Sequence, residues 1–254
     1  MASAPKQHLM TDGLILRNYD TATEADRFVA ILTRDKGIVR ASARGARRLN
    51  SRSGAATQPL CYAQLSLIPS RGKYIIEDAK PKEVFFPLRQ DVERLALAQY
   101  FCELAMSVCP EDAPAEEHLR LMLGGLYFLS SKEKNPLLVK AVVEGRLLCL
   151  EGYAPDLYGC AHCMRDAEPL WFSPSAGTLF CSEHVSAGDA MQISAGVLAA
   201  LRHILHGPFE RCFAFSLPAA EVAVLATLTE RFLLAQVGKN YKTLEFYHTL
   251  REGN

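Results

Sequence analysis

The sequence predicts an α+β protein in which an N-terminal β-barrel is followed by an α-helical domain with an inserted metal-binding hairpin. Three observations lead to this prediction. Short runs of branched and apolar residues fill residues 1–82, and a period of three to four residues replaces them in residues 83–254. Two closely spaced pairs of metal-ligating side chains interrupt the helical pattern between about residues 156 and 190. We therefore expect two domains, residues 1–82 and residues 83–254, because a chain of 254 residues exceeds the usual length of one.

Five short strands are expected in residues 1–82. Residues 35–37, Gly54 and residues 70–72 supply turn-forming side chains between them. The expected strands cover residues 13–19, 25–33, 38–44, 61–69 and 74–78. Five strands in so short a segment fit a small closed barrel of the OB-fold type. Residues 45–58, which are polar, small and basic, indicate a flexible loop between the third and fourth strands.

Helices are expected from about residue 88 onwards. Apolar residues recur at spacings of three and four in residues 97–108, 119–126 and 138–142, and Pro110, Pro114 and Pro136 mark the breaks. Ser194 is a favourable N-cap for a further helix, which should end near Gly207. A last apolar stripe from about residue 218 to residue 235 predicts one more helix.

Cys160 and Cys163 form one close pair of metal-ligating residues, and Cys181 and His184 form another after seventeen intervening residues. Two such pairs can supply four ligands to one tetrahedral zinc ion, a closed set that leaves no position for a reacting water. We therefore predict one structural Zn²⁺, which anchors a hairpin formed by the residues between the pairs. A redox-active pair at Cys160 and Cys163, or unrelated buried thiols, are the alternatives. His162 could also replace His184 as the fourth ligand.

The net charge of zero conceals an uneven distribution. Residues 1–80 contain thirteen Lys and Arg against seven Asp and Glu, a balance of +6, whereas the remainder contains fifteen against twenty-one, a balance of −6. A basic module of this kind is expected to face a polyanion such as nucleic acid. The residues predicted to neutralise phosphates are Arg34, Lys36, Arg40, Arg44, Arg47, Arg48, Arg52, Arg71 and Lys73. The alternative is an ordinary solvated surface.

Three aromatic side chains lie on the expected barrel strands, namely Phe28, Tyr62 and Tyr74. Aromatic residues on such strands either stack on nucleobases or fill the core. The sequence leaves both roles open.

Several classes of protein are disfavoured. No apolar run reaches the roughly 18 residues of a membrane span, and the N-terminus lacks the layout of a signal peptide. We therefore expect a cytoplasmic protein without membrane contact, in which Cys61, Cys102, Cys109 and Cys149 are reduced core thiols. A Walker-type phosphate loop, a G-x-S-x-G elbow and an H-E-x-x-H helix are missing, so no enzymatic activity is expected. The rival hypotheses are a zinc-dependent enzyme with Glu183 as base and an adaptor whose barrel binds only protein.

Several short sequence segments, taken together and in order, resemble those of a known protein family. In the expected barrel they are residues 32–37 (LTRDKG), 45–48 (GARR), 51–52 (SR) and 58–59 (QP). Further on they are residues 144–148 (EGRLL), 152–155 (GYAP), 238–239 (GK) and 242–244 (KTL). In this order they resemble the RecO family of bacterial recombination mediators, whose members differ in whether they keep the zinc ligands. The resemblance spans nearly the whole chain.

The resemblance implies a function that composition alone does not. RecO proteins bind single- and double-stranded DNA, anneal complementary strands, contact the acidic C-terminal tail of single-stranded DNA-binding protein (SSB), and join RecR to load RecA at gaps. RecF is a further expected partner, and the protein is expected at the nucleoid. For this chain, Lys140 and Arg146 on the helix before the metal-binding segment are the predicted contacts for the SSB tail. Ordinary helix surface charge is the alternative for both.

Overall fold

The computed structural model describes residues 8–19, 24–48, 50–51, 53–166, 169–186 and 188–253. The chain divides into two compact units, Met1–Ser131 with Tyr241–Asn254, and Lys132–Asn240. The first unit combines the barrel with three α-helices, so the compact units do not divide at the change from strands to helices expected at residue 83. Among the described residues, none of the helices has the length and apolar character that a membrane span requires.

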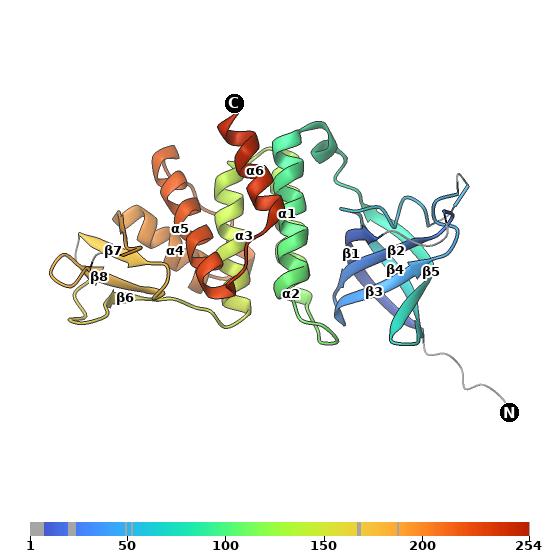
Figure 1. Cartoon of the computed structure of the whole chain (residues 1–254), viewed down its shortest axis with the longest axis horizontal. Helices are drawn as coiled ribbons and strands as arrows, with labels where there is room; N and C mark the ends of the chain where they lie inside the picture. The colour runs from blue at the N-terminus through green and yellow to red at the C-terminus, as the bar shows by residue number, and fades with distance from the viewer. Residues whose placement is uncertain are drawn as a thin grey trace. The chain divides into compact units, whose positions relative to one another are not determined.

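A closed five-stranded barrel opens the chain and a helical region follows it (Figure 1), which confirms the predicted fold class. The strands are β1 (Leu9–Tyr19), β2 (Arg27–Thr33), β3 (Gly37–Ala43), β4 (Tyr62–Ser70) and β5 (Lys73–Glu83). They follow the order β1-β2-β3-β5-β4, and β3 pairs with β5 in parallel. β1 begins earlier than expected and β5 ends later because both continue to pair with β4 beyond the apolar runs that predicted them.

Apolar side chains from all five strands fill the barrel interior. The segment between β3 and β4, for which the sequence predicts a flexible loop, adds Ala46 and Ala56 to this core. The buried Arg27 of β2 holds the segment, since its Nη1 donates to the Gly54 carbonyl and to Thr57 Oγ1, each at 2.8 Å. The described residues of this segment are therefore a series of turns packed against the barrel rather than a free loop.

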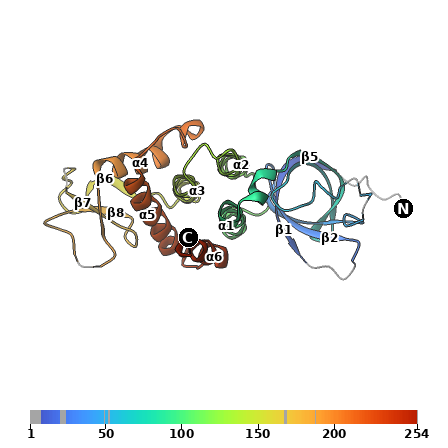
Figure 2. The same cartoon turned by 90° about the horizontal axis from the view of Figure 1, so that it is seen from above.

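Helices α1 (Val92–Val108), α2 (Glu116–Ser131) and α6 (Lys242–Glu252) belong to the first unit, with the 3₁₀ helix η1 (Phe86–Gln90) before α1. Asp91 caps α1 by accepting a hydrogen bond from the backbone N–H of Arg94 at 3.2 Å. α1 and α2 pack on the outside of β1 and β2 (Figure 2), where Leu14, Leu16 and Leu32 are buried. α6 packs along α1.

The second unit contains α3 (Pro136–Leu150), α4 (Ala195–His206), the 3₁₀ helix η2 (Phe209–Arg211) and α5 (Ala219–Val237). Between α3 and α4 the chain forms a sheet of β6 (Asp156–Cys160), β7 (Leu170–Ser173), β8 (Thr178–Cys181) and β9 (Met191–Ile193), in the order β6-β8-β7-β9. β7 and β8 form the predicted hairpin, with Trp171 opposite Phe180. The Ser194 side chain accepts a hydrogen bond from the Val197 N–H at 3.2 Å, and α4 ends at Gly207, both as predicted.

Candidate nucleic-acid interface and metal centre

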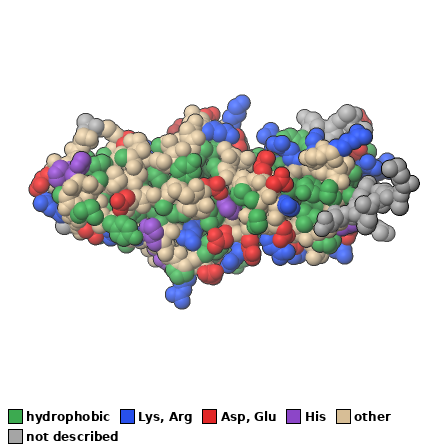
Figure 3. All heavy atoms as spheres, turned by 90° about the horizontal axis from the view of Figure 1, so that it is seen from below, with side chains coloured by type: hydrophobic (Ala, Val, Ile, Leu, Met, Phe, Trp, Pro, Cys, Tyr) green, Lys and Arg blue, Asp and Glu red, His purple; other side chains and the backbone are tan. Residues whose placement is uncertain are grey.

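Six of the predicted DNA-binding cations are exposed and form no ion pair within the described ranges of the chain. These six residues, which we call the basic surface, are Arg40, Arg44, Arg47, Arg48, Arg71 and Lys73. Figure 3 shows Lys and Arg side chains around the margin of the barrel on the face that it draws. Arg34 is exposed but paired, Lys36 is half-buried in the same turn, and Arg52 lies outside the described residues. The sequence predicts the same role for all nine cations, whereas the structure distinguishes the exposed, unpaired ones from Arg34, which is paired, and Lys36, which is half-buried.

Strand pairing brings two residues of the basic surface together from different parts of the chain. Ala41 and Ser42 of β3 pair in parallel with Tyr74 and Ile75 of β5. Arg40, which precedes Ala41 on β3, therefore lies beside Lys73, which precedes Tyr74 on β5, whereas Arg44, Arg47 and Arg48 follow the other end of this pairing. Neighbouring strands are only about 4.8 Å apart, so long cationic side chains on both can reach the same polyanion.

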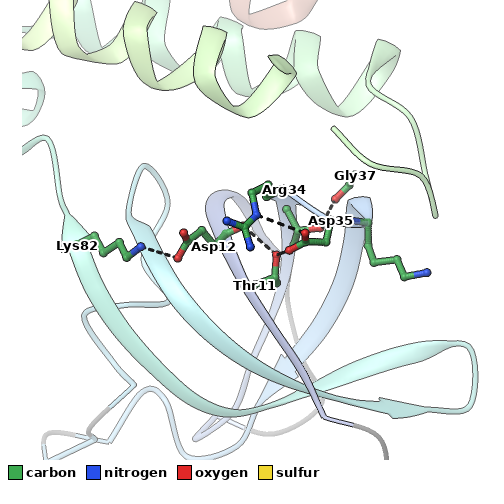
Figure 4. Close-up of polar contacts among 8 residues, drawn as sticks. Thr11, Asp12, Arg34, Asp35, Gly37 and Lys82 are labelled. Carbon is green, nitrogen blue, oxygen red and sulfur yellow. Dashed lines mark hydrogen bonds and ion pairs between the residues drawn. The ribbon is translucent and has the colours of Figure 1, made fainter. Parts of the chain in front are cut away.

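The turn between β2 and β3 has a different character, because acidic side chains lie next to its cations (Figure 4). Thr11 Oγ1 donates to Asp35 Oδ2 at 2.6 Å, and Arg34 Nε donates to Asp35 Oδ1 at 3.3 Å. Lys82 of β5 forms an ion pair of 2.6 Å with Asp12. The hydrogen bond to Asp35 and its charge raise the pKa of Arg34, while the hydrogen bond from Thr11 lowers the pKa of Asp35. Positive charge is thus balanced at this end of the barrel.

The three aromatic side chains identified in the sequence have different surroundings. Tyr74 packs against the barrel core. Tyr62 is half-buried next to Lys82, whose Nζ lies 5.3 Å from the ring centroid. Phe28 lies opposite Tyr19 across β1 and β2, with ring centroids 5.7 Å apart. Sequence analysis misses Tyr19 because it becomes a neighbour of Phe28 only when the two strands pair.

Cys160, Cys163, Cys181 and His184 converge in the second unit, with their ligand atoms all within 4.8 Å of one another. Sγ of Cys163 lies 3.8 Å from Sγ of Cys181, and His184 Nδ1 lies 3.6 and 3.2 Å from Sγ of Cys160 and Cys181. Tetrahedral bonds of ~2.3 Å to sulfur and ~2.0 Å to nitrogen place two sulfurs about 3.8 Å apart and sulfur and nitrogen about 3.5 Å apart. The four residues therefore fit a tetrahedral metal ion of this size.

Two tight backbone turns orient these ligands. The N–H of Met164 donates to the Cys160 carbonyl at 2.8 Å, and the N–H of His184 donates to the Cys181 carbonyl at 3.0 Å. A Cβ at Gly159 would lie 2.7 Å from the Met164 carbonyl oxygen, which explains the glycine before the first ligand. Burial raises the pKa of Cys160, but hydrogen bonds from nearby backbone N–H groups outweigh it and lower the pKa to about 5. The turn thus favours the thiolate, the form that binds metals.

His184 is the histidine that belongs to the cluster. His162 is exposed, and its ring lies beside those of His184 and Phe180, with centroids 5.2 and 5.9 Å away. Sequence spacing leaves both histidines open because each lies next to a cysteine pair. The geometry places Nδ1 of His184 against the sulfur atoms.

Lys140 lies in the interior of the second unit rather than at the surface, where a partner-binding cation is expected. Its side chain is 1% exposed, and Nζ forms ion pairs of 2.9 Å with Glu144 and 2.7 Å with Glu230 of α5. Thr229 donates a hydrogen bond of 2.8 Å to Glu144 Oε2. Burial raises the pKa of Glu144, and the charge of Lys140 opposes that shift. The prediction of an exposed charge at Lys140 is therefore corrected, because its acidic partners are supplied by α3 and α5.

Arg146 is half-buried and holds the end of α4. Its Nη1 donates to the carbonyls of Ile204, Leu205 and Gly207 at 3.2, 2.9 and 3.3 Å. The last carbonyls of a helix lack partners within the helix and carry partial negative charge, so a guanidinium is favourable there. The Arg146 guanidinium carbon also lies 5.4 Å from the ring centroid of Phe209. Arg146 thus has a structural role within the chain, although part of its side chain remains at the surface.

The three consecutive residues Glu144, Gly145 and Arg146 join three helices. Glu144 connects α3 to α5 through Lys140 and Thr229, and Arg146 connects α3 to α4. A Cβ at Gly145 would lie 3.1 Å from Cγ2 of Ile204, so glycine permits the close approach of α4. The contacts of these residues within the helical region therefore explain why Glu, Gly and Arg stand at these three positions.

The fold and the site together place this chain in the class of α+β proteins with an N-terminal OB-type barrel and a helical region that carries a Cys₃His cluster. The family described as Recombination protein O N terminal matches residues 7–85, and the family described as Recombination protein O C terminal matches residues 89–245. The chain therefore belongs to the RecO family of DNA repair proteins.

Curated relatives extend over both regions. DNA repair protein RecO of Acetivibrio thermocellus is 33% identical over 245 residues, which cover 96% of this chain and 97% of that protein. DNA repair protein RecO of Symbiobacterium thermophilum is 31% identical over 247 residues, 94% of this chain and 96% of that protein. DNA repair protein RecO of Desulforudis audaxviator is 32% identical over 238 residues, with 93% and 94% covered. These matches confirm the resemblance found in the sequence and assign the chain to DNA repair.

Proposed function

We propose that this chain is a recombination mediator that binds single- and double-stranded DNA, anneals complementary strands and, with RecR, helps to load RecA onto SSB-coated single-stranded DNA. The observation that supports this proposal most directly is the basic surface. It consists of six exposed cations, unpaired with acids among the described residues, on an OB-type barrel. Membership of the RecO family supports the same function.

The proposed mechanism is neutralisation of phosphate charge. Each Lys or Arg that contacts a phosphate releases condensed counterions, so binding is strong at low salt and weakens as salt rises. Five of the six residues of the basic surface are arginines, whose guanidinium groups bind phosphate oxygens through two parallel hydrogen bonds. Two strands held against the same positive surface repel each other less, which favours pairing of complementary bases. No step needs a nucleophile, so the chain acts as a binding protein rather than an enzyme.

We also propose that the Cys₃His cluster holds one Zn²⁺ with a structural role. Zinc prefers tetrahedral sites with sulfur and nitrogen ligands, and a closed set of four leaves no position for a reacting water. The ion would join β6, which ends at Cys160, to β8, which ends at Cys181. Glu183, the base considered for a zinc-dependent enzyme, instead forms an ion pair of 2.9 Å with Arg165.

The proposed partners besides DNA are RecR, the acidic C-terminal tail of SSB, and RecF. Of the two cations considered for the SSB tail, Arg146 is the one whose side chain reaches the surface. We propose that the protein works in the cytoplasm at the nucleoid, without membrane contact.

An adaptor whose barrel binds only protein is the alternative function. Such an interface does not need a group of unpaired cations, so salt-dependent DNA binding separates it from a mediator. The test substitutes Arg44, Arg47 and Arg48 by Gln together and measures binding of labelled single- and double-stranded DNA at increasing salt. Arg34→Gln is the matched control, because Arg34 is exposed but paired with Asp35.

The salt dependence gives the expected result. If the triple variant loses three phosphate contacts, the slope of log K against log salt should become less steep by roughly 0.7 to 0.9 per contact. Arg34→Gln should change this slope less. An unchanged slope in the triple variant, or wild-type protein that binds no DNA, would favour the adaptor.

A further inference from the structure

The outside of the barrel carries a patch of basic and aromatic side chains that shares Arg40 and Lys73 with the basic surface. The strand register forms one row from Arg17, Ala30 and Arg40, and the next row from Tyr19, Phe28 and Ser42. Side chains two residues apart along a strand point to the same face, so both rows lie on one face of the sheet. Lys73, at the start of β5, reaches this patch from the turn after β4.

Each of the two rings in the patch has a cation over it. Lys73 Nζ lies 4.8 Å from the ring centroid of Phe28, and the Arg17 guanidinium carbon lies 5.5 Å from that of Tyr19. Both rings are half-buried, so they are neither part of the core nor fully solvated. The Tyr19 hydroxyl also contacts Met106 Sδ of α1 at 4.0 Å, which fixes one edge of the pair.

This arrangement combines the two features that bind single strands. Nucleobases of any sequence stack on aromatic rings, while neighbouring cations hold the phosphates that flank the stacked base. In a duplex each base is already stacked and paired, so its faces are not available to protein side chains. A ring pair at the surface therefore distinguishes single strands from duplexes, whereas cations alone bind both.

We propose that Tyr19 and Phe28 form a stacking site for unpaired nucleobases, which makes the barrel prefer single-stranded over double-stranded DNA. Arg17 and Lys73 move from the rings to the flanking phosphates when a base stacks. Cation–π contacts at exposed sites are weak, so this displacement opposes binding only slightly. The inference rests on the proposed function, because it specifies how the DNA-binding barrel recognises single strands.

Tyr62 offers a comparison within the same barrel. It is also half-buried, and Lys82 lies over it at 5.3 Å. However, Lys82 is paired with Asp12 at 2.6 Å, and this carboxylate would repel a phosphate. Tyr62 therefore also has a cation over its ring, but the charge of this cation is neutralised by Asp12. We expect no stacking site at Tyr62.

The test replaces each ring by an aliphatic side chain in the full-length chain. Tyr19→Leu and Phe28→Leu keep apolar volume, and thermal unfolding checks that the barrel remains folded. Each substitution should weaken binding of a labelled single-stranded oligonucleotide about tenfold and leave duplex binding within about twofold of wild type. Tyr62→Leu, the matched control, should leave both affinities unchanged.

A second measurement keeps the proposal testable if the Leu variants do not fold. Phe28→Trp retains an aromatic ring, and combined with Trp171→Phe it supplies the single fluorescent indole, because the chain contains one Trp. Single-stranded DNA should quench this fluorescence, and an equal concentration of bound duplex should quench it less.

The outcomes separate the stacking site from DNA binding itself. Unchanged single-strand affinity in both Leu variants, with salt-dependent DNA binding retained, would overturn the stacking site and leave the proposed function intact. Equal losses for single strands and duplexes would also overturn it, since the effect would not depend on exposed bases. Wild-type protein that binds neither form of DNA would refute the proposed function and the stacking site together.

Discussion

Single residues in this chain have roles that depend on distant parts of the sequence. Lys140 and Arg27 are both basic and both buried, with only 1% and 7% of their surface exposed to solvent. Lys140 is neutralised by two carboxylates, whereas Arg27 donates to a backbone carbonyl and a hydroxyl. A buried charge is tolerated only with such partners, so removal of one partner is more costly than the contact itself suggests.

Lys140→Met should lower the free energy of unfolding by about 3 kcal/mol or more at neutral pH, because Glu144 would remain buried without its counter-charge. Burial already raises the pKa of Glu144 above the ordinary value of a glutamate, and loss of Lys140 removes the charge that opposes this rise. A carboxyl whose pKa is higher in the folded state binds a proton on folding, so stability is lost as the pH rises through that pKa. The variant should therefore approach wild type as the pH falls towards the acidic range.

Urea unfolding of both proteins at mildly acidic and neutral pH measures this difference. Lys140→Met combined with Glu144→Gln should recover part of the loss at neutral pH, because the amide carries no charge. A loss that is equal at every pH and is not reduced in the double variant would mean that packing, rather than the ion pair, is disturbed.

At the scale of elements, two connecting segments are each held by a few specific contacts. The segment between β3 and β4 has alanines in the barrel core and is held by Arg27. The segment between α3 and α4 is a small sheet whose strands β6 and β8 end at metal-ligating cysteines. We therefore expect the contacts of Arg27 and of the metal-ligating residues to contribute strongly to the stability of these two segments.

Arg27→Leu should release the segment between β3 and β4. Hydrogen bonds from a charged donor contribute about 1.5 to 3 kcal/mol, and the variant leaves the acceptors at Gly54 and Thr57 without it. We expect stability to fall by roughly 2 to 4 kcal/mol and amide exchange in residues 53–58 to accelerate. Arg40→Leu, at an exposed position on β3, is the control and should change neither; equal effects of the two would show that the segment does not depend on Arg27.

His184→Ala and His162→Ala test the metal site with two histidines that lie 5.2 Å apart, ring to ring. Purified wild type should contain one zinc per chain, and His184→Ala should release it to a coloured chelator far more readily and unfold at lower temperature, because metal binding is coupled to folding. His162→Ala should retain zinc as wild type does. Retention in the first variant and loss in the second would assign the fourth ligand to His162.

The features that could be predicted from sequence are those encoded within a short window. The barrel strands are short runs rich in branched and apolar residues, and Cys160 and Cys163 fall within one turn, so both features are visible locally. The pairing of Lys140 with Glu230 joins residues ninety positions apart, and the contact of Tyr19 with Phe28 needs the register of two strands. Such partners become known only when the fold has brought them together.

At the scale of the whole molecule, charge is divided unevenly between the two parts of the chain. Residues 1–80 carry a balance of +6 and include the basic surface, whereas the remainder carries −6. A polyanion such as DNA is attracted to the first part and repelled by much of the second. An acidic protein tail can therefore bind the second part only at a local positive group, of which Arg146 is one.

The last prediction concerns this division between DNA and partner. Arg146→Met should weaken binding of a labelled acidic SSB-tail peptide about fivefold, because a cation near an acidic ligand mainly contributes complementary charge. Arg146→Lys keeps the charge but not the guanidinium, whose Nη1 donates to the carbonyls of Ile204, Leu205 and Gly207 at the end of α4, so it should lose less peptide affinity while showing a similar loss of stability. DNA binding should stay close to wild type in both variants, because the basic surface lies on the barrel. Undiminished peptide binding in Arg146→Met would place the partner site elsewhere, and a parallel loss of DNA binding would mean that DNA and the peptide share a surface.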